Sequence, residues 1–114
     1  MDAKLKKDQF ELYDLVVEVE SINGHCTCEM SVGDCFELAG GKLSIPDGQS
    51  FCLYALQSCI PLLPAKQRQC AEADWMETDV HVTCPDPACG LIMRIERKDL
   101  RTWNHDDVSA IPMK

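Results

Sequence analysis

Eight cysteines are the residues of this 114-residue chain whose side chains do chemistry most readily. Thiolates bind soft metal ions, and accessible thiols react with oxidants or serve as nucleophiles. Their spacing matches neither the paired Cys-x2-Cys pattern of zinc sites nor the cysteine run of a ferredoxin. The sequence leaves three alternatives open: metal ligands, inert buried thiols, or a reactive thiol. The thiols stand at Cys26, Cys28, Cys35, Cys52, Cys59, Cys70, Cys84 and Cys89.

The segment 79–97 contains the most informative pair of these thiols. Two alternating apolar runs flank a connection rich in proline, which predicts an antiparallel hairpin with Cys84 and Cys89 on either side of its turn. Asp86 lies between two prolines and is expected to serve the turn. The stretch Cys84-Pro-Asp-Pro-Ala-Cys-Gly90 resembles a zinc-ribbon knuckle widened by two residues. In such a knuckle the glycine lets backbone N–H groups approach the sulfur.

Three distant parts of the chain supply the predicted ligands. Two cysteines lie in a loop after the first predicted strand, one at the start of a predicted helix, and two at the hairpin turn. We predict that they gather in one pocket and bind zinc or an iron–sulfur cluster, which all-thiolate ligation suits about equally. Cys59 lies two helical turns beyond Cys52, roughly 10 Å away, so one ion cannot bind both. The predicted ligands are Cys26, Cys28, Cys52, Cys84 and Cys89.

Hydrophobic periodicity predicts the elements that must position these thiols. Alternation over 13–19 predicts a strand, 25–34 is a loop, and 35–38 and 43–45 are short strands. A helix capped by Ser50 is expected to kink at Pro61, and 65–73 forms a second helical segment. The fold class is α+β, with a small, mainly antiparallel sheet and one kinked helix packed on a face. We expect a flexible N-terminus at 1–10, one domain at 11–97, and a tail at 98–114.

The net charge and the hydropathy of the chain indicate which partners it can bind and in which cellular compartment it lies. Eleven basic against nineteen acidic residues give a net charge of −8, which argues against a nucleic-acid-binding protein. No apolar segment approaches the roughly 20 residues that span a bilayer, and the N-terminus lacks the apolar core of a signal peptide. We therefore expect a cytoplasmic protein with no membrane contact. Trp103 in the tail is expected to pack on the domain or on another subunit.

Residues 11–97 resemble a small, functionally uncharacterised prokaryotic family, frequent in anaerobes, that ends in a Cys-Pro-Asp-Pro hairpin. The resemblance is carried by Gly33-Asp34, Phe36-Glu37, Pro61, Trp75 and the hairpin, in this order. It implies an α+β domain and singles out Cys26, Cys52 and Cys84 as the cysteines typical of the family. The chain departs from the family pattern Cys-Pro-x-Gly-His at 26–30, where Met30 replaces the histidine and Cys28 is additional.

These observations favour a non-catalytic metal- or iron–sulfur-binding accessory protein, or a small subunit of a larger anaerobic enzyme complex with a protein partner or a second copy. The first alternative is a thiol-dependent redox protein or enzyme that uses Cys52. The second is a metal-free protein-interaction module. No Ser/His/Asp order, glycine-rich phosphate loop or carboxylate pair stands out, so we expect no enzyme activity from the chain alone.

Overall fold

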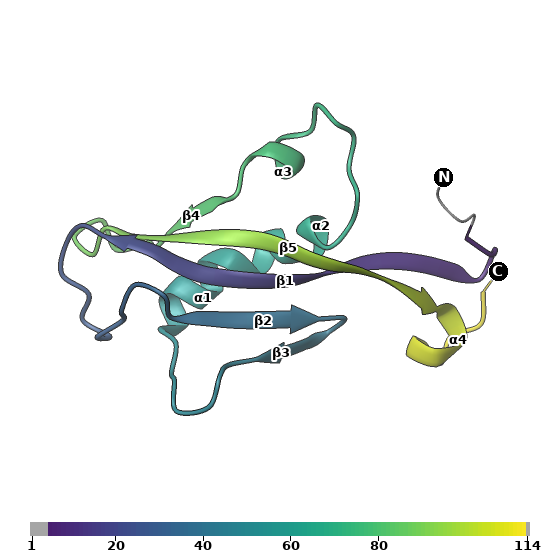
Figure 1. Cartoon of the computed structure of the whole chain (residues 1–114), viewed down its shortest axis with the longest axis horizontal. Coiled ribbons are helices and arrows are strands. Elements are labelled where there is room, and N and C mark those ends of the chain that lie inside the picture. Colours follow the sequence, from purple (N-terminus) through teal and green to yellow (C-terminus); the bar gives the residue numbers. More distant parts are fainter. Residues whose placement is uncertain (1–4, 114) are drawn as a thin grey trace.

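Two 14-residue strands, β1 (Gln9–Ile22) and β5 (Leu91–Asn104), pair antiparallel and form the centre of the protein (Figure 1). The computed structural model describes residues 5–113. Bulges interrupt the register between Tyr13 and Leu15 and again between Val19 and Ser21. Between the bulges, Val17 pairs with Ile95 and Val19 with Met93, so both strands direct alternate apolar residues to one face.

Three shorter strands complete the sheet. β2 (Cys35–Ala39) pairs with β1, β3 (Lys42–Ser44) pairs with β2, and β4 (His81–Thr83) pairs with β5. The order is β3-β2-β1-β5-β4, and every neighbouring pair is antiparallel. The predicted hairpin is confirmed, since β4 and β5 pair across the turn that carries Cys84 and Cys89.

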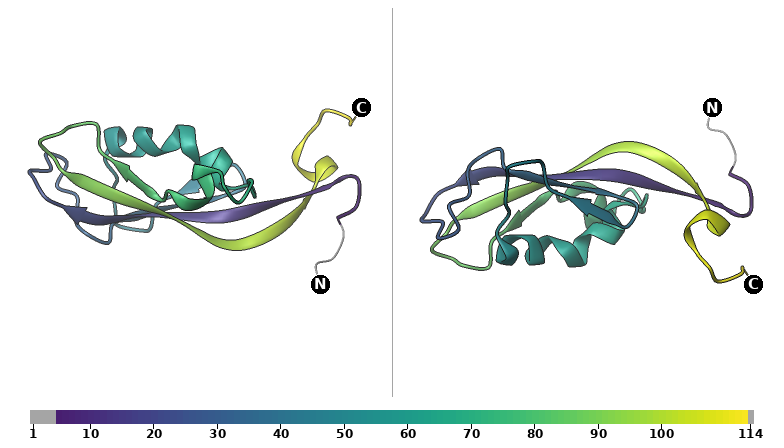
Figure 2. Two further views of the ribbon diagram at one scale, coloured as in Figure 1. Left: turned by 90° about the horizontal axis from the view of Figure 1, so that it is seen from above. Right: turned by 90° about the horizontal axis from the view of Figure 1, so that it is seen from below.

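One continuous helical path covers a single face of the sheet (Figure 2). It consists of α1 (Leu53–Cys59), the 3-10 turn η1 (Ile60–Leu62) and α2 (Leu63–Lys66). Pro61 lies in the 3-10 turn, where its missing N–H interrupts the α-helical pattern. The α+β fold with one kinked helix on a mainly antiparallel sheet is therefore confirmed. Among residues 5–113, no helix is long and apolar enough to cross a membrane.

Two details of the predicted helices are wrong. Cys52, not Ser50, is the N-cap of α1, because the chain stays extended while the Phe51 ring packs edge-on against Phe36 at 5.0 Å. The second helical segment ends at Lys66 and does not reach residue 73. Its next carbonyl groups turn to the sheet, since Gln67 O accepts a hydrogen bond from Tyr13 N at 2.7 Å.

Arg97 holds the connection after α2 against the sheet. Its guanidinium forms two hydrogen bonds with the Glu77 carboxylate, at 2.9 and 2.6 Å, and its Nε donates to Lys66 O at 2.8 Å. It also lies 4.7 Å above the centre of the Tyr13 ring. Glu77 belongs to α3 (Trp75–Thr78), a short helix capped by Asp74. This cluster links α2, α3 and both long strands.

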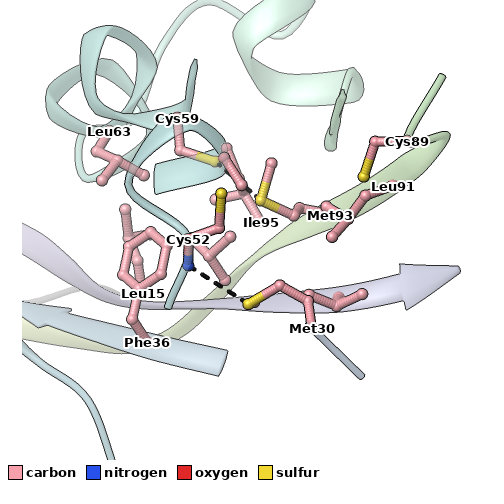
Figure 3. Close-up of a cluster of buried hydrophobic side chains, with 13 residues drawn as sticks. Leu15, Met30, Phe36, Cys52, Cys59, Leu63, Cys89, Leu91, Met93 and Ile95 are labelled. Carbon is pink, nitrogen blue, oxygen red and sulfur yellow. Dashed lines mark hydrogen bonds between the residues drawn. The ribbon is translucent and has the colours of Figure 1, made fainter. Parts of the chain in front are cut away.

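The core lies between the helical path and the sheet (Figure 3). Strand residues and helix residues both contribute side chains that are almost fully buried, and sulfur atoms are common among them. The Cys59 thiol donates to Met93 Sδ at 3.6 Å, and Cys52 N donates to Met30 Sδ at 3.4 Å. The buried cluster includes Leu15, Val17, Val19, Phe36, Ala55, Leu63, Leu91 and Ile95.

The long strands continue past the rest of the sheet as a two-stranded arm. Residues Gln9 to Tyr13 pair with Leu100 to Asn104, and α4 (His105–Val108) follows directly. The predicted boundaries at residues 10 and 97 thus fall inside β1 and β5. The β5 half of the arm, residues 98–104, shows no apolar alternation, because the helical path does not extend over the arm (Figure 2). Trp103 packs back on the domain, over Gly40 at the β2–β3 turn.

Candidate thiol site

The loop after β1 docks against the β4–β5 turn. Three consecutive backbone hydrogen bonds join them: Asn23 N to Gly90 O at 3.1 Å, Gly24 N to Cys89 O at 3.0 Å, and His25 N to Ala88 O at 3.0 Å. The approach is so close that a Cβ on Gly24 would lie 2.0 Å from Ala88 O. Only glycine allows this contact, and the contact places Cys26 next to the turn.

The turn itself has the geometry that the knuckle resemblance implied. Gly90 adopts a left-handed conformation with φ of +64°, and the Leu91 N–H reaches back to the Cys89 sulfur. Cys84 N donates to Leu91 O at 3.0 Å and closes the hairpin. The Asp86 carboxylate accepts a hydrogen bond from Ala88 N at 3.0 Å, so it serves the turn as predicted. Backbone N–H groups aimed at sulfur stabilise a thiolate, which is the form that binds metal.

Four of the five predicted ligands line one pocket of about 370 Å³. Cys26 and Cys28 come from the loop, and Cys84 and Cys89 from the two sides of the turn. Tyr54, at the start of α1, forms another wall together with Thr27, Pro85 and Asp86. The loop and the turn, which are distant in sequence, therefore meet at this pocket, whereas Cys52 from the third predicted segment does not line it.

Cys89 is the most buried thiol of the pocket, with 3% of its surface exposed. Burial is the main cause that raises its pKa, to about 11. Interactions with the Cys26 side chain and with the nearby Cys84 sulfur add to the rise, against the opposing Leu91 N–H. The sulfurs of Cys26 and Cys84 are therefore both near enough to act on the Cys89 thiol.

Cys28 and Cys52 form a second interacting pair at the edge of the pocket. Interaction with the Cys52 side chain is the main cause that raises the pKa of Cys28. Burial alone disfavours the Cys52 thiolate. The N–H groups of Ala55 and Tyr54 and the Cys28 thiol together outweigh that burial and lower the pKa of Cys52.

The thiols touch in pairs but do not converge on one point. Within the described part of the chain, no group of three or more His, Cys, Asp or Glu side chains is arranged to hold a metal ion. All eight cysteines are free thiols. Cys59 is fully buried away from the pocket, and burial raises its pKa to about 12. Cys35 and Cys70 are partly exposed and do not line the pocket.

Comparisons with protein-family models, with curated proteins and with solved structures found no match for this chain. The resemblance to the Cys-Pro-Asp-Pro hairpin family therefore stays a prediction.

Two features of the site were not predicted from the sequence. The first is the pairing of the thiols, Cys26 with Cys89 and Cys28 with Cys52, which depends on how the loop docks on the turn. The second is Tyr54 as a wall of the pocket. Its place two residues after Cys52, at an outward position of the helix, was the only available signal.

Proposed function

We propose that the pocket binds a soft metal centre through Cys26, Cys28, Cys84 and Cys89, with Cys52 as the neighbour of Cys28. The observation that carries this proposal is the set of four thiols around one pocket, three of which interact directly. The knuckle at Gly90 supports it, because the Leu91 N–H offsets charge on the Cys89 thiolate. Binding requires the four side chains to turn about their Cα–Cβ bonds toward a common point.

Zinc and an iron–sulfur cluster share this thiolate chemistry. Direct contact between thiols favours a single tetrahedral ion, because ligands at about 2.3 Å from zinc are themselves nearly in contact. Four protein thiolates complete that coordination and leave no open position for a substrate. We therefore infer a non-catalytic role, as a cytoplasmic accessory protein or a small subunit of a larger complex.

Cobalt(II) and zinc titrations of the reduced, metal-free protein test this proposal. Cobalt(II) is expected to give sulfur-to-metal charge-transfer absorption at one equivalent, and zinc is expected to displace it. A Cys26→Ser, Cys89→Ser variant should lose this binding, whereas a Cys35→Ser, Cys70→Ser control keeps it. Brown protein with iron and sulfide after anaerobic reconstitution selects the cluster instead. Equal binding by both double variants would refute the pocket.

A protein partner is the second part of the proposal, and the outer face of the helical path supports it. No charged residue occurs from residue 48 to residue 65, although 26% of the chain is charged. Leu53 and Tyr54 are 63% and 62% exposed, and Ile60 is 48% exposed. A stripe of exposed apolar side chains on an otherwise acidic protein is typical of a docking surface. Two copies of net charge −8 repel each other, which favours a different protein as the partner.

A photo-crosslinking residue at position 53, in cells of the source organism, tests this surface. Glu20 lies exposed on the opposite, charged face of the sheet and provides the matched control position. We expect one discrete adduct from position 53 and none from position 20. An adduct of twice the 12.8 kDa chain mass would identify a second copy, and equal labelling from both positions would exclude the docking surface.

A further inference from the structure

The loop that carries Cys28 lies directly on the start of α1. Cys52 N donates a hydrogen bond to Met30 Sδ at 3.4 Å, drawn as a dashed line in Figure 3. Glu29, between Cys28 and Met30, has a φ of +56°, which is unusual for a residue with a side chain. This local reversal lets Met30 enter the core, with 8% of its surface exposed, while Cys28 stays at the surface.

The two thiols are neighbours that differ in accessibility. Cys28 is exposed, whereas Cys52 is 9% exposed and belongs to the buried core. The Cys28 side chain interacts with that of Cys52, and Met30, two residues further along the same loop, accepts the hydrogen bond from Cys52 N. A molecule from solvent therefore meets Cys28 first, and Cys52 lies behind it within reach of the same sulfur. Cys28 is therefore the accessible thiol of the pair, and Cys52 is placed to resolve a bond formed on Cys28.

We propose that Cys28 and Cys52 are a redox-active dithiol, which a low-molecular-weight disulfide converts into a reversible intramolecular disulfide. In the first step the Cys28 thiolate attacks one sulfur of the small disulfide and forms a mixed disulfide. The leaving thiolate takes up the proton that Cys28 lost. In the second step Cys52 attacks the Cys28 sulfur, the bond to the small molecule breaks, and a second small thiol leaves. Two electrons and two protons pass in total from the protein to the small disulfide.

Oxidation of this pair has a consequence for the pocket, and this part rests on the proposed metal-binding function. Cys28 lines the pocket with Cys26, Cys84 and Cys89. A disulfide to Cys52 removes Cys28 from the thiolate set, because a disulfide sulfur carries no charge to bind a metal ion. The pocket would then offer three protein thiolates, and its affinity for the metal ion would fall. Reduction by a small thiol restores the fourth.

The test uses the full, reduced, metal-free chain in buffers with varied ratios of reduced to oxidised glutathione. Remaining thiols are alkylated, and peptides are mapped by mass spectrometry. We expect a disulfide that links Cys28 to Cys52. A Cys52→Ser variant should accumulate glutathione on Cys28, and a Cys28→Ser variant should form neither product. A Cys35→Ser control should behave like the wild type.

Two outcomes would overturn the inference. One is a disulfide between Cys26 and Cys89, the other interacting pair, in place of the expected one. The second is a wild-type protein that keeps both thiols at every glutathione ratio. A zinc titration of the same reduced sample separates this inference from the proposed function. Zinc binding without the disulfide refutes only the redox pair, and the disulfide without zinc binding refutes only the metal centre.

Discussion

A single methyl group at Gly24 should separate the loop after β1 from the β4–β5 turn, the two segments that carry the thiols of the pocket. A Cβ at this position would lie 2.0 Å from Ala88 O and 2.9 Å from Cys89 O. Real Cβ contacts are essentially never shorter than 3.0 Å, so the loop and the turn must part by at least 3.0 − 2.0 = 1.0 Å. Both obstacles are backbone atoms, which cannot rotate out of the way. Gly24→Ala is therefore expected to open the contact between the loop and the β4–β5 turn.

The cost follows from the three hydrogen bonds that join these segments. Each is 3.0 to 3.1 Å long, and a bond lengthened by 1 Å is lost. At a net contribution of about 1 kcal/mol each, Gly24→Ala should lower the free energy of unfolding by about 3 kcal/mol. For a domain of this size the melting temperature should fall by roughly 10 °C. Zinc affinity should fall about 10- to 100-fold, because Cys26 moves away from Cys89.

Gly41→Ala is the matched control, since a Cβ at Gly41 meets nothing within 4 Å. Urea denaturation and zinc competition with a coloured chelator measure the two effects on both variants. Gly41→Ala should stay within about 0.5 kcal/mol of the wild type. If Gly24→Ala behaves like Gly41→Ala in both assays, the loop does not dock on the turn and the pocket is not formed as described.

Three further predictions concern the Arg97 cluster and the buried core. Hydrogen bonds from Arg97, and then from Cys70 N, lower the pKa of Glu77 to about 2 from its ordinary 4.5. The pair therefore stabilises the protein above about pH 4.5 and loses that effect as the pH falls toward 2. In a Glu77→Gln variant, the midpoint of urea denaturation should depend less on pH between about 4.5 and 2 than it does in the wild type. The same pH dependence in both proteins would contradict the pairing of Glu77 with Arg97. Cys59, with its raised pKa and full burial, should resist alkylation at pH 8 until the protein unfolds, long after Cys28 has reacted. Alkylation of Cys59 in the native protein as fast as that of Cys28 would refute its burial. Cys59→Ser should lower the free energy of unfolding by about 1–3 kcal/mol, because the buried hydroxyl gains no good partner in place of the Met93 contact. Urea denaturation of the variant and the wild type measures this difference.

The central strands were predictable from sequence because burial imposes a pattern on them. Leu15, Val17 and Val19 alternate with more exposed residues where a helix lies above the sheet. Beyond that helix the same two strands form an arm, and the sequence 98–104 has no apolar period. Periodicity could not extend the strand there, because the pattern reports burial of one face and not strand pairing itself.

Helix ends were less predictable, because tertiary contacts decide them. Ser50 is a good N-cap by residue type, yet packing of Phe51 on Phe36 delays the helix to Leu53. The end at Lys66 depends on hydrogen bonds from Tyr13 and Arg97, which are distant in sequence. Local propensity carries no information on such contacts.

The gathering of the thiols could be predicted, but their pairing could not. The knuckle resemblance and the loop position of Cys26 and Cys28 predicted one pocket, and four of the five predicted cysteines line it. The pairing of Cys26 with Cys89 depends on the register of three backbone hydrogen bonds at Gly24 and its neighbours. Cysteine spacing alone does not determine that register.

Elemental analysis of the protein, expressed in its natural host and purified without oxygen, tests the metal centre most directly. We expect one zinc per chain, or iron with matching sulfide if a cluster is bound. The content should fall to background in the Cys26→Ser, Cys89→Ser variant and persist in the Cys35→Ser, Cys70→Ser control. Folded wild-type protein with no metal, or a metal content that is the same in both double variants, would contradict a thiolate centre in this pocket.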